Sequence, residues 1–255
     1  MTSNGCEIGY VESGSGGAVP IVFLHGVGSD KSVWHPQLSH FGARRRAVAF
    51  DYPGYGDSDR APEGTSRDDY ASAVLSAMER LGIERAHICG LSLGGIVAIA
   101  MHHRAPGRCS SLILADTFAV HPEGRAIYQR GIAGSGDLKA MAEARVDVLI
   151  AQPADREVRR EIVDTMSRID PASYRIGAEA VWLADQRDRA GAISVPTLIV
   201  VGDQDFITPV DLSNELVDLI PDARMQVIAG AGHLTNLEKP DEFNALVGEF
   251  LDRLD

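Results

Sequence analysis

A serine stands between two glycines at Gly90-Leu-Ser92-Leu-Gly94. A short apolar run over residues 86–89 precedes this motif, and an apolar stretch over residues 96–101 follows it. This order predicts a strand, a tight turn and a helix, the context in which a serine hydroxyl is presented at the end of a sheet. A helix N-cap would explain the serine but not both glycines, which prevent side chains from colliding across the turn. Ser92 is therefore the candidate nucleophile.

A serine hydroxyl attacks a carbonyl only when a neighbouring base takes its proton and an acid fixes the tautomer of that base. Among the eight histidines, His233 follows the last strand-like run in the glycine-rich segment Ala229-Gly-Ala-Gly-His233. Such a loop can bring the imidazole back over the serine. We take His233 as the candidate base, with a loop histidine that lacks a partner as the alternative.

The acid is sought at the carboxyl ends of strands, where α/β sheets place their sites. Gly202-Asp-Gln-Asp205 follows the apolar run over residues 196–201, and Asp116 follows the run over residues 111–115. Asp205 is preferred, Asp203 is the close competitor from spacing, and Asp116 is a third candidate.

Acyl transfer also needs N–H donors for the oxyanion of the tetrahedral intermediate. The backbone N–H of Leu93, directly after the serine at a predicted helix start, is one candidate donor. The segment His25-Gly26-Val27-Gly28 follows another predicted strand and offers the N–H of Val27 as the second. Its two glycines could suggest a dinucleotide loop, but the third glycine of that motif is absent.

The elements that must position these residues alternate along the chain. Short apolar runs predict strands over residues 19–24, 47–50, 86–89, 111–115, 196–201 and 225–228, and helical periodicity covers residues 68–81, 93–103, 210–220 and 241–254. This alternation predicts an α/β fold with a largely parallel central sheet flanked by helices. The first dozen residues, with Ser13-Gly-Ser-Gly-Gly17 after Ile8-Gly-Tyr-Val11, are expected to form an antiparallel hairpin at the sheet edge.

The alternation stops over residues 118–192, where three helical stripes follow one another without a strand. We expect an inserted helical cap there, between core segments 1–117 and 193–255. Gly131, Gly134 and Gly136 precede the first stripe and are interpreted as turn formers. Six side chains are candidates for lining a pocket between core and cap, although ordinary core packing is the alternative for each: His25, Trp34, Phe118, Tyr128, Trp182 and Phe206.

Length and charge limit the partners. A chain of 255 residues can bury one sizeable core, and its formal net charge of −12 disfavours binding to nucleic acid or to anionic lipid. Cys6, Cys89 and Cys109 have no metal-ligand spacing and indicate no disulfide framework. No apolar run approaches the ~18 residues of a membrane span, and the first residues lack the features of a leader. We therefore expect a cytoplasmic protein that needs no metal or cofactor, and the sequence assigns no oligomeric state.

Several of these segments together resemble the α/β-hydrolase superfamily over essentially the whole chain: His25-Gly26, Asp51-Tyr-Pro-Gly54-Tyr-Gly56-Asp-Ser58, the motif around Ser92, Gly202-Asp-Gln-Asp205 and Gly232-His233. The resemblance implies that the second aspartate of the acid turn, Asp205, is the triad acid. It also implies that residues 51–58 form a structural turn. A serine nucleophile separates the chain from the haloalkane dehalogenases and epoxide hydrolases, which use aspartate.

Two longer segments, residues 28–38 and 232–238, are similar to the 3-oxoadipate enol-lactonases and their esterase relatives. This similarity implies a cofactor-free serine hydrolase that cleaves a small carboxylic ester or lactone through an acyl-enzyme on Ser92. The alternative is a C–C hydrolase of meta-cleavage products, although those commonly carry tryptophan where Leu234 stands. A receptor of the same fold without catalysis is a further alternative. The carboxylate of a lactonase-type substrate would need a local cation, for which Arg125, Arg130 and Arg145 are candidates.

Overall fold

The computed structural model describes residues 2–3 and 6–255, with side chains from Glu7 onward. Six strands form one sheet in the order β4-β3-β5-β6-β7-β8, and the pairing is parallel from β3 to β8. The strands are β3 (Tyr10–Leu24), β4 (Arg45–Phe50), β5 (Ala86–Leu91), β6 (Cys109–Ala115), β7 (Thr197–Gly202) and β8 (Ala223–Ile228). Each predicted strand is thus present, and the mostly parallel α/β sheet is confirmed.

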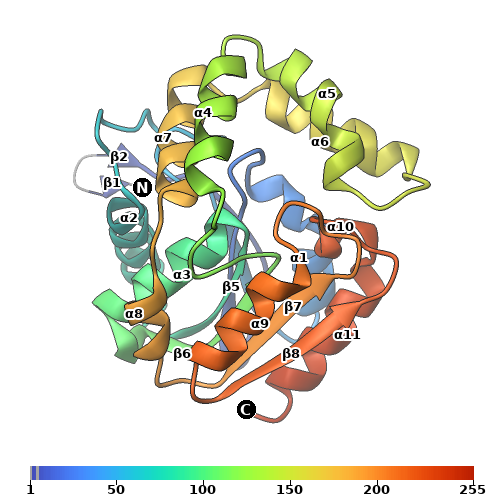
Figure 1. The fold of residues 1–255 in the computed structure, drawn as a ribbon. Coiled ribbons are helices and arrows are strands. Elements are labelled where there is room, and N and C mark those ends of the chain that lie inside the picture. Colours follow the sequence, from blue (N-terminus) through green and yellow to red (C-terminus); the bar gives the residue numbers. More distant parts are fainter. Residues whose placement is uncertain (1, 4–5) are drawn as a thin grey trace.

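Helices cover both faces of this sheet (Figure 1). Along β3, Val22 and Leu24 pack into the core beside α2 and α3, whereas Ile21 and Phe23 pack into a second core beside α1 and α11. Burial on both faces explains why the central strands β5, β6 and β7 are buried along their whole length without alternation. The helices of the core around the sheet are α1 (His35–Gly42), α2 (Arg67–Arg80), α3 (Leu93–Arg104), α9 (Val210–Leu219), α10 (Thr235–Glu238) and α11 (Pro240–Leu251). Two short 3-10 turns, η1 (Lys31–Trp34) and η2 (Pro106–Arg108), accompany them.

The antiparallel hairpin expected for the first dozen residues is present in part: an antiparallel pair forms there, but the segment over residues 8–17 pairs differently. Tyr10 lies opposite Phe50 of β4 and Ser13 lies opposite Ala47, so the start of β3 pairs with β4 and not with the residues that follow it. The glycines serve close approach rather than a tight hairpin turn, because a Cβ on Gly16 would overlap the carbonyl oxygen of Arg44. Within the described residues, an antiparallel pair is formed instead by β1 (Thr2–Ser3) and β2 (Cys6–Glu7).

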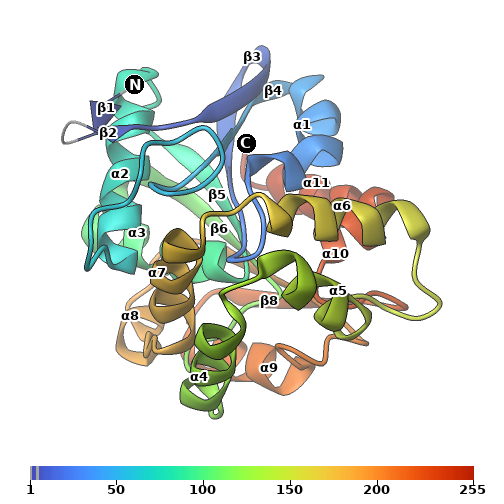
Figure 2. The same ribbon diagram turned by 90° about the horizontal axis from the view of Figure 1, so that it is seen from above.

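The helical segment, residues 118–192, contains α4 (Gly124–Gly134), α5 (Leu138–Leu149), α6 (Arg156–Ser167), α7 (Pro171–Trp182) and α8 (Arg187–Gly191). Figures 1 and 2 show two helix pairs, α4 with α7 and α5 with α6, above the sheet, and α8 packs lower, against α3 and α9. The three predicted stripes correspond to α5, α6 and α7. Each of these helices begins at an aspartate whose side chain accepts backbone hydrogen bonds from the first turn: Asp137, Asp155 and Asp170.

Helix α4 was not predicted, and the interpretation of Gly131 and Gly134 as turn formers is wrong, because both lie inside it. A Cβ on Gly131 would lie 3.2 Å from the hydroxyl of Tyr174 on α7, and one on Gly134 would lie 2.8 Å from Cε of Met141 on α5. These glycines therefore let α4 pack closely against its neighbours.

The turn over residues 51–58 has a structural network of its own. The buried carboxylate of Asp51 accepts hydrogen bonds from the backbone N–H of Lys31 at 2.8 Å, from Lys31 Nζ at 2.6 Å and from the N–H of Asp57 at 2.9 Å. This geometry agrees with the structural role expected for the segment. Cys89 and Cys109 are buried free thiols, and the side chain of Cys6 lies outside the described residues.

Candidate active site

Ser92 occupies the turn between β5 and α3 with a φ of 54°. This left-handed backbone is strained for a serine, and it is held because the Ser92 N–H donates to the Ala115 carbonyl at 2.9 Å and Thr117 Oγ1 donates to the Ser92 carbonyl at 2.8 Å. The flanking glycines are sterically required: a Cβ on Gly90 would overlap the carbonyl oxygen of Gly94, and one on Gly94 would overlap that of Leu24. The lack of a side chain at Gly94 thus lets the turn pack directly against the main chain of β3 at Leu24.

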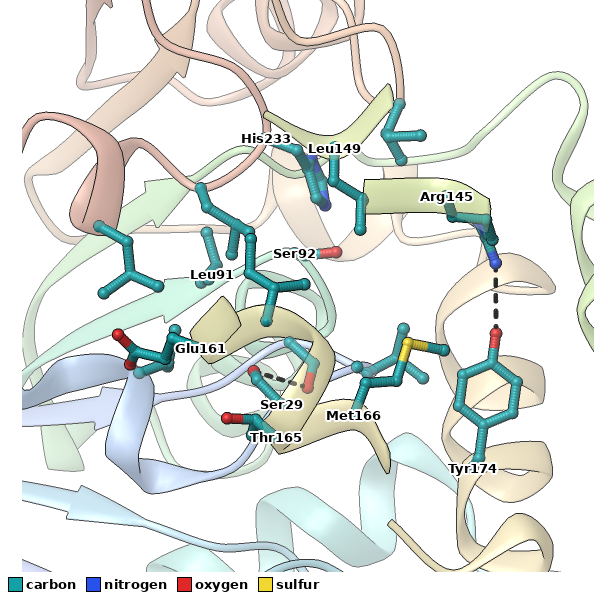
Figure 3. Close-up of a pocket in the computed structure, with 18 of the residues that line it drawn as sticks. Ser29, Leu91, Ser92, Arg145, Leu149, Glu161, Thr165, Met166, Tyr174 and His233 are labelled. Atoms are coloured by element: carbon teal, nitrogen blue, oxygen red, sulfur yellow. Dashed lines mark hydrogen bonds between the residues drawn. The ribbon is translucent and has the colours of Figure 1, made fainter. Parts of the chain in front are cut away.

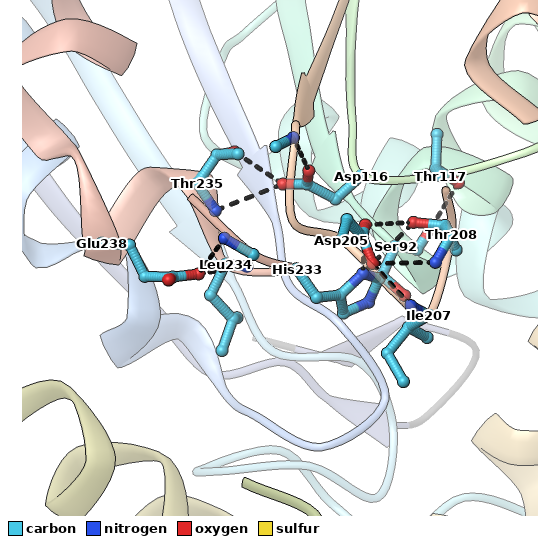
Figure 4. Close-up of polar contacts among 12 residues, drawn as sticks. Ser92, Asp116, Thr117, Asp205, Ile207, Thr208, His233, Leu234, Thr235 and Glu238 are labelled. Carbon is cyan, nitrogen blue, oxygen red and sulfur yellow. Dashed lines mark hydrogen bonds and ion pairs between the residues drawn. The ribbon is translucent and has the colours of Figure 1, made fainter. Parts of the chain in front are cut away.

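The loop after β8 brings His233 to Asp205, which follows β7 (Figure 4). His233 Nδ1 lies 2.8 Å from Asp205 Oδ2. The other carboxylate oxygen accepts the backbone N–H groups of Ile207 and Thr208, both at 2.8 Å, and Thr208 Oγ1 donates to Oδ2 at 2.5 Å. The main chain of His233 is also fixed, since its N–H donates to the Leu149 carbonyl at 2.7 Å.

Electrostatics strengthen this pair. Burial by itself lowers the pKa of His233, but the charge of Asp205 and its hydrogen bond outweigh burial and raise the pKa above its usual value. Burial would raise the pKa of Asp205, yet the His233 and Thr208 interactions lower it. The carboxylate is therefore ionised next to an imidazole that holds a proton on Nδ1.

Ser92 and His233 line the same cavity beneath α5 and α6 (Figure 3). Across the part of the chain that the structure describes, no hydrogen bond joins Ser92 Oγ to the His233 ring. Such contacts are often long in ligand-free enzymes and tighten when substrate binds.

The two other acid candidates lie elsewhere. Asp203 is exposed and accepts the N–H of Gly230 at 2.7 Å. Asp116 is buried, with its carboxylate accepting the N–H of Gly202 at 3.1 Å and Thr235 Oγ1 at 2.6 Å. Burial and the nearby charge of Asp205 raise the pKa of Asp116 well above its usual value. Of the three aspartates, Asp205 is the one hydrogen-bonded to the imidazole.

The predicted oxyanion donors flank the serine. Gly26 and Val27 line the cavity, and a Cβ on Gly26 would lie 3.6 Å from Cβ of Ser92. Within the described residues, neither the N–H of Val27 nor that of Leu93 has a hydrogen-bond acceptor. Both donors are thus available to a ligand oxygen near Ser92.

Of the six side chains expected to line the pocket, Trp182 lines the cavity that contains Ser92. His25 lies behind the loop, with Nδ1 2.8 Å from the Gly26 carbonyl and its ring 4.5 Å from that of Tyr52. Burial lowers the pKa of this histidine.

The remaining four expectations are corrected by packing. The rings of Phe23 and Phe243 surround Trp34 in the core at 4.9 and 6.1 Å, and the ring of Phe118 stacks behind Trp182 at 5.8 Å. Tyr128 on α4 does not line this cavity, and Phe206 lines a neighbouring one.

Two charged residues of the helical segment enter the Ser92 cavity from different sides (Figure 3). Arg145 on α5 donates to Tyr174 Oη at 3.4 Å and lies 3.8 Å from the sulfur of Met141; no acidic partner is found for it in the described chain. Of the three arginines proposed from the sequence, Arg145 is therefore the one at Ser92, while Arg130 lines the neighbouring cavity and Arg125 lines neither.

Glu161 on α6 was missed, and burial raises its pKa. The only available signal was its place directly before Ile162, a member of the apolar stripe of that helix.

The described residues contain neither a metal-binding cluster nor a membrane-spanning helix. No three His, Cys, Asp or Glu side chains there are arranged to hold a metal ion. None of the described helices is long and apolar enough to cross a membrane.

Residues 21–246 match the model of the alpha/beta hydrolase family. The chain belongs to this family. The enol-lactonase of Burkholderia xenovorans has a similar structure, with a TM-score of 0.91 and 30% identity over 98% of both chains. The 3-oxoadipate enol-lactonase 1 of Acinetobacter baylyi is 28% identical over 94% of this hydrolase and 91% of its own length.

Relatives with other activities are equally similar. The dihydrolipoyllysine-residue acetyltransferase component of the acetoin cleaving system of Pseudomonas putida is 30% identical, over 95% of this chain but 66% of that protein. A 2-hydroxy-6-oxononadienedioate/2-hydroxy-6-oxononatrienedioate hydrolase of Cupriavidus pinatubonensis is 28% identical over 92% of this chain and 87% of its own length. Family membership therefore places the chain in a hydrolase superfamily but does not identify its substrate.

Proposed function

We propose that this hydrolase cleaves a small carboxylic ester or lactone through an acyl-enzyme on Ser92. The observation that carries the proposal is the His233–Asp205 hydrogen bond of 2.8 Å beside a strained serine that lines the same cavity. Residues 118–192 would act as the cap of this site, over a core made of residues 1–117 and 193–255.

In the proposed mechanism, Ser92 Oγ attacks the substrate carbonyl while His233 Nε2 takes its proton. Asp205 holds the other ring nitrogen and stabilises the imidazolium that forms. The oxyanion accepts hydrogen bonds from the backbone N–H groups of Val27 and Leu93. His233 then protonates the leaving oxygen, and a water molecule activated by the same imidazole hydrolyses the acyl-enzyme.

Arg145 favours substrates that carry a carboxylate. Its guanidinium lines the Ser92 cavity, and the hydrogen-bond partners that it has in the described chain are uncharged, so an anionic substrate group would supply the missing counter-charge. The names of two relatives, both enol-lactonases, support the same substrate class.

The test is hydrolysis of an activated aryl ester and of a carboxylate-bearing enol-lactone, with Ser92→Ala and His233→Ala as variants. Each substitution should lower kcat by about 10³-fold or more, and the double variant should be hardly slower than either, because the triad acts as a unit. Ser72→Ala on α2, which does not line the cavity, is the control and should retain the wild-type rate.

A Ser92→Ala variant with more than about a tenth of the wild-type rate would contradict a serine mechanism. A higher kcat/KM for a dienoic diketone than for every ester and lactone would replace the proposal by C–C hydrolysis, the activity named for the Cupriavidus relative. Binding of these compounds without turnover would identify a receptor.

A further inference from the structure

A second cavity adjoins the one that contains Ser92. This outer cavity is lined by residues of α4, of α5 and of the segment that leads from Phe206 into the first turn of α9. Arg145 and Ile207 line both cavities, so the two spaces meet at these side chains. The inner cavity measures about 80 Å³ and the outer about 820 Å³.

The inner cavity is too small for a complete ester substrate. An apolar protein cavity of about 150 Å³ holds one benzene molecule, roughly twice the inner volume. The inner space can therefore take the reacting carbonyl and a short chain attached to it. The rest of a larger substrate must extend past Arg145 and Ile207 into the outer cavity.

The position of the junction indicates which half of the ester extends outward. Ile207 donates its N–H to Asp205, the partner of His233, whereas the oxyanion loop of Gly26 and Val27 lines the inner cavity alone. The alcohol oxygen must face His233 to receive its proton, while the acyl carbonyl faces Val27. The alcohol half therefore points toward the junction.

The outer cavity has a lining suited to an uncharged apolar group. Phe206 is 75% exposed and Val148 is 48% exposed, and these are two of the four large apolar side chains exposed in the described chain. Ile127 and Leu212 also line this cavity. The charged lining residues balance in sign: Glu123 and Asp137 against Arg130 and Arg145. Exposed apolar surface next to a reactive site is typical of a ligand-binding groove.

We propose that the outer cavity is the alcohol subsite of this hydrolase and binds the alkyl or aryl part of an ester's leaving group. The inference rests on the proposed function. It predicts an asymmetric specificity, in which the enzyme accepts long alcohols but only short acyl groups.

Two ester series test the asymmetry. In acetates of linear alcohols from ethanol to octanol, kcat/KM should rise about two- to fourfold for each added CH₂ until the cavity is filled. In ethyl esters of linear acids from acetate to octanoate, kcat/KM should fall. A rise with acyl length, or a flat alcohol series, would overturn the alcohol subsite.

Variants on two separate elements guard against a misfolded protein. Phe206→Ser beside the acid turn and Val148→Ser on α5 should each reduce the octyl-to-ethyl ratio of kcat/KM at least threefold. Val227→Ser is the matched control, because this valine on β8 is 43% exposed and lines neither cavity, so its ratio and rate should equal those of the wild type. If both cavity variants keep the wild-type ratio, the subsite assignment is wrong.

Kinetics distinguish a wrong subsite from a wrong reaction. If esters are hydrolysed in a Ser92-dependent manner but the alcohol series is flat, the subsite is wrong while the proposed function stands. If no ester or lactone is hydrolysed, both are wrong.

Discussion

Asp205 and Asp203 differ by two positions in one turn, yet their surroundings predict different consequences of losing a carboxylate. Asp205→Asn should reduce kcat by about 10⁴-fold, because an amide can favour the wrong tautomer of His233 and cannot stabilise the imidazolium. Asp203→Asn is the matched control: its carboxylate is exposed and, among the described residues, accepts one hydrogen bond, from the N–H of Gly230, so kcat should change less than about threefold. Steady-state kinetics of both variants check this. Equal losses of kcat in the two variants would show that Asp205 is not the triad acid, and Asp116 would be tested next.

The raised pKa of His233 sets the pH dependence of the reaction. The base must be neutral to accept the serine proton, so activity is present at high pH and is lost as pH falls through the pKa of His233. Burial lowers that pKa, but the opposite effect of Asp205 is larger. The midpoint of kcat/KM against pH should therefore lie above the ordinary histidine value of 6.5. In Asp205→Asn the residual activity should show a lower midpoint. A wild-type midpoint below 6.5 would contradict the ion pair.

Local patterns were sufficient to find the catalytic candidates but not the lining of the cavity. Ser92 and His233 stand in glycine-rich segments whose geometry is encoded by near neighbours in the chain. Trp34, by contrast, is taken into the core by Phe23 and Phe243, and the latter lies more than 200 residues away in sequence. The neighbouring sequence of a single aromatic residue does not indicate whether its side chain will face the core or the cavity.

The turn between β5 and α3 depends on the absence of a side chain at Gly94. Gly94→Ala should destabilise the protein by more than about 2 kcal/mol, because the new Cβ would overlap the rigid main chain of β3 at Leu24. Gly248→Ala in α11 is the control. Beyond its chain neighbours and the backbone of its own helix, no described residue lies within 4 Å of the added methyl there, so this substitution should stabilise the helix by about 0.5–1 kcal/mol. Urea unfolding followed by circular dichroism measures both, and similar stabilities would refute the steric account.

The sequence predicts the helices and strands that have a strong apolar periodicity. It does not predict those whose form depends on contacts with distant parts of the chain. The buried strands and the stripes of α5, α6 and α7 have apolar patterns that can be recognised within a short stretch of sequence. Helix α4 contains Gly131 and Gly134, which sequence reasoning assigns to turns, whereas Tyr174 and Met141 leave little room for a larger residue at these positions of the packed helix. The pairing of the start of β3 with β4 likewise depends on an edge whose free hydrogen-bonding groups no local pattern reveals.

On the scale of the whole molecule, overall charge and local charge oppose each other. The chain carries 36 acidic and 24 basic residues, and its net charge of −12 repels an approaching anion. Within the cavity, Arg145 attracts the same anion at short range. Added salt screens the long-range repulsion, with a Debye length of about 10 Å at 0.1 M, more effectively than it screens a contact in a partly buried site.

Salt should therefore raise the rate of capture of an anionic substrate. Between about 10 mM and 0.3 M sodium chloride, kcat/KM for a carboxylate-bearing lactone should increase about two- to fivefold, while that for a neutral ester of similar size should change little. Arg145→Gln separates the two effects: kcat/KM for the lactone should fall at least tenfold at either salt concentration, because the local contact is lost while the repulsive field remains. The neutral ester serves as the internal control for the integrity of the catalytic site. A lactone rate that falls with salt in the wild type would show that local attraction governs capture and that the overall field does not.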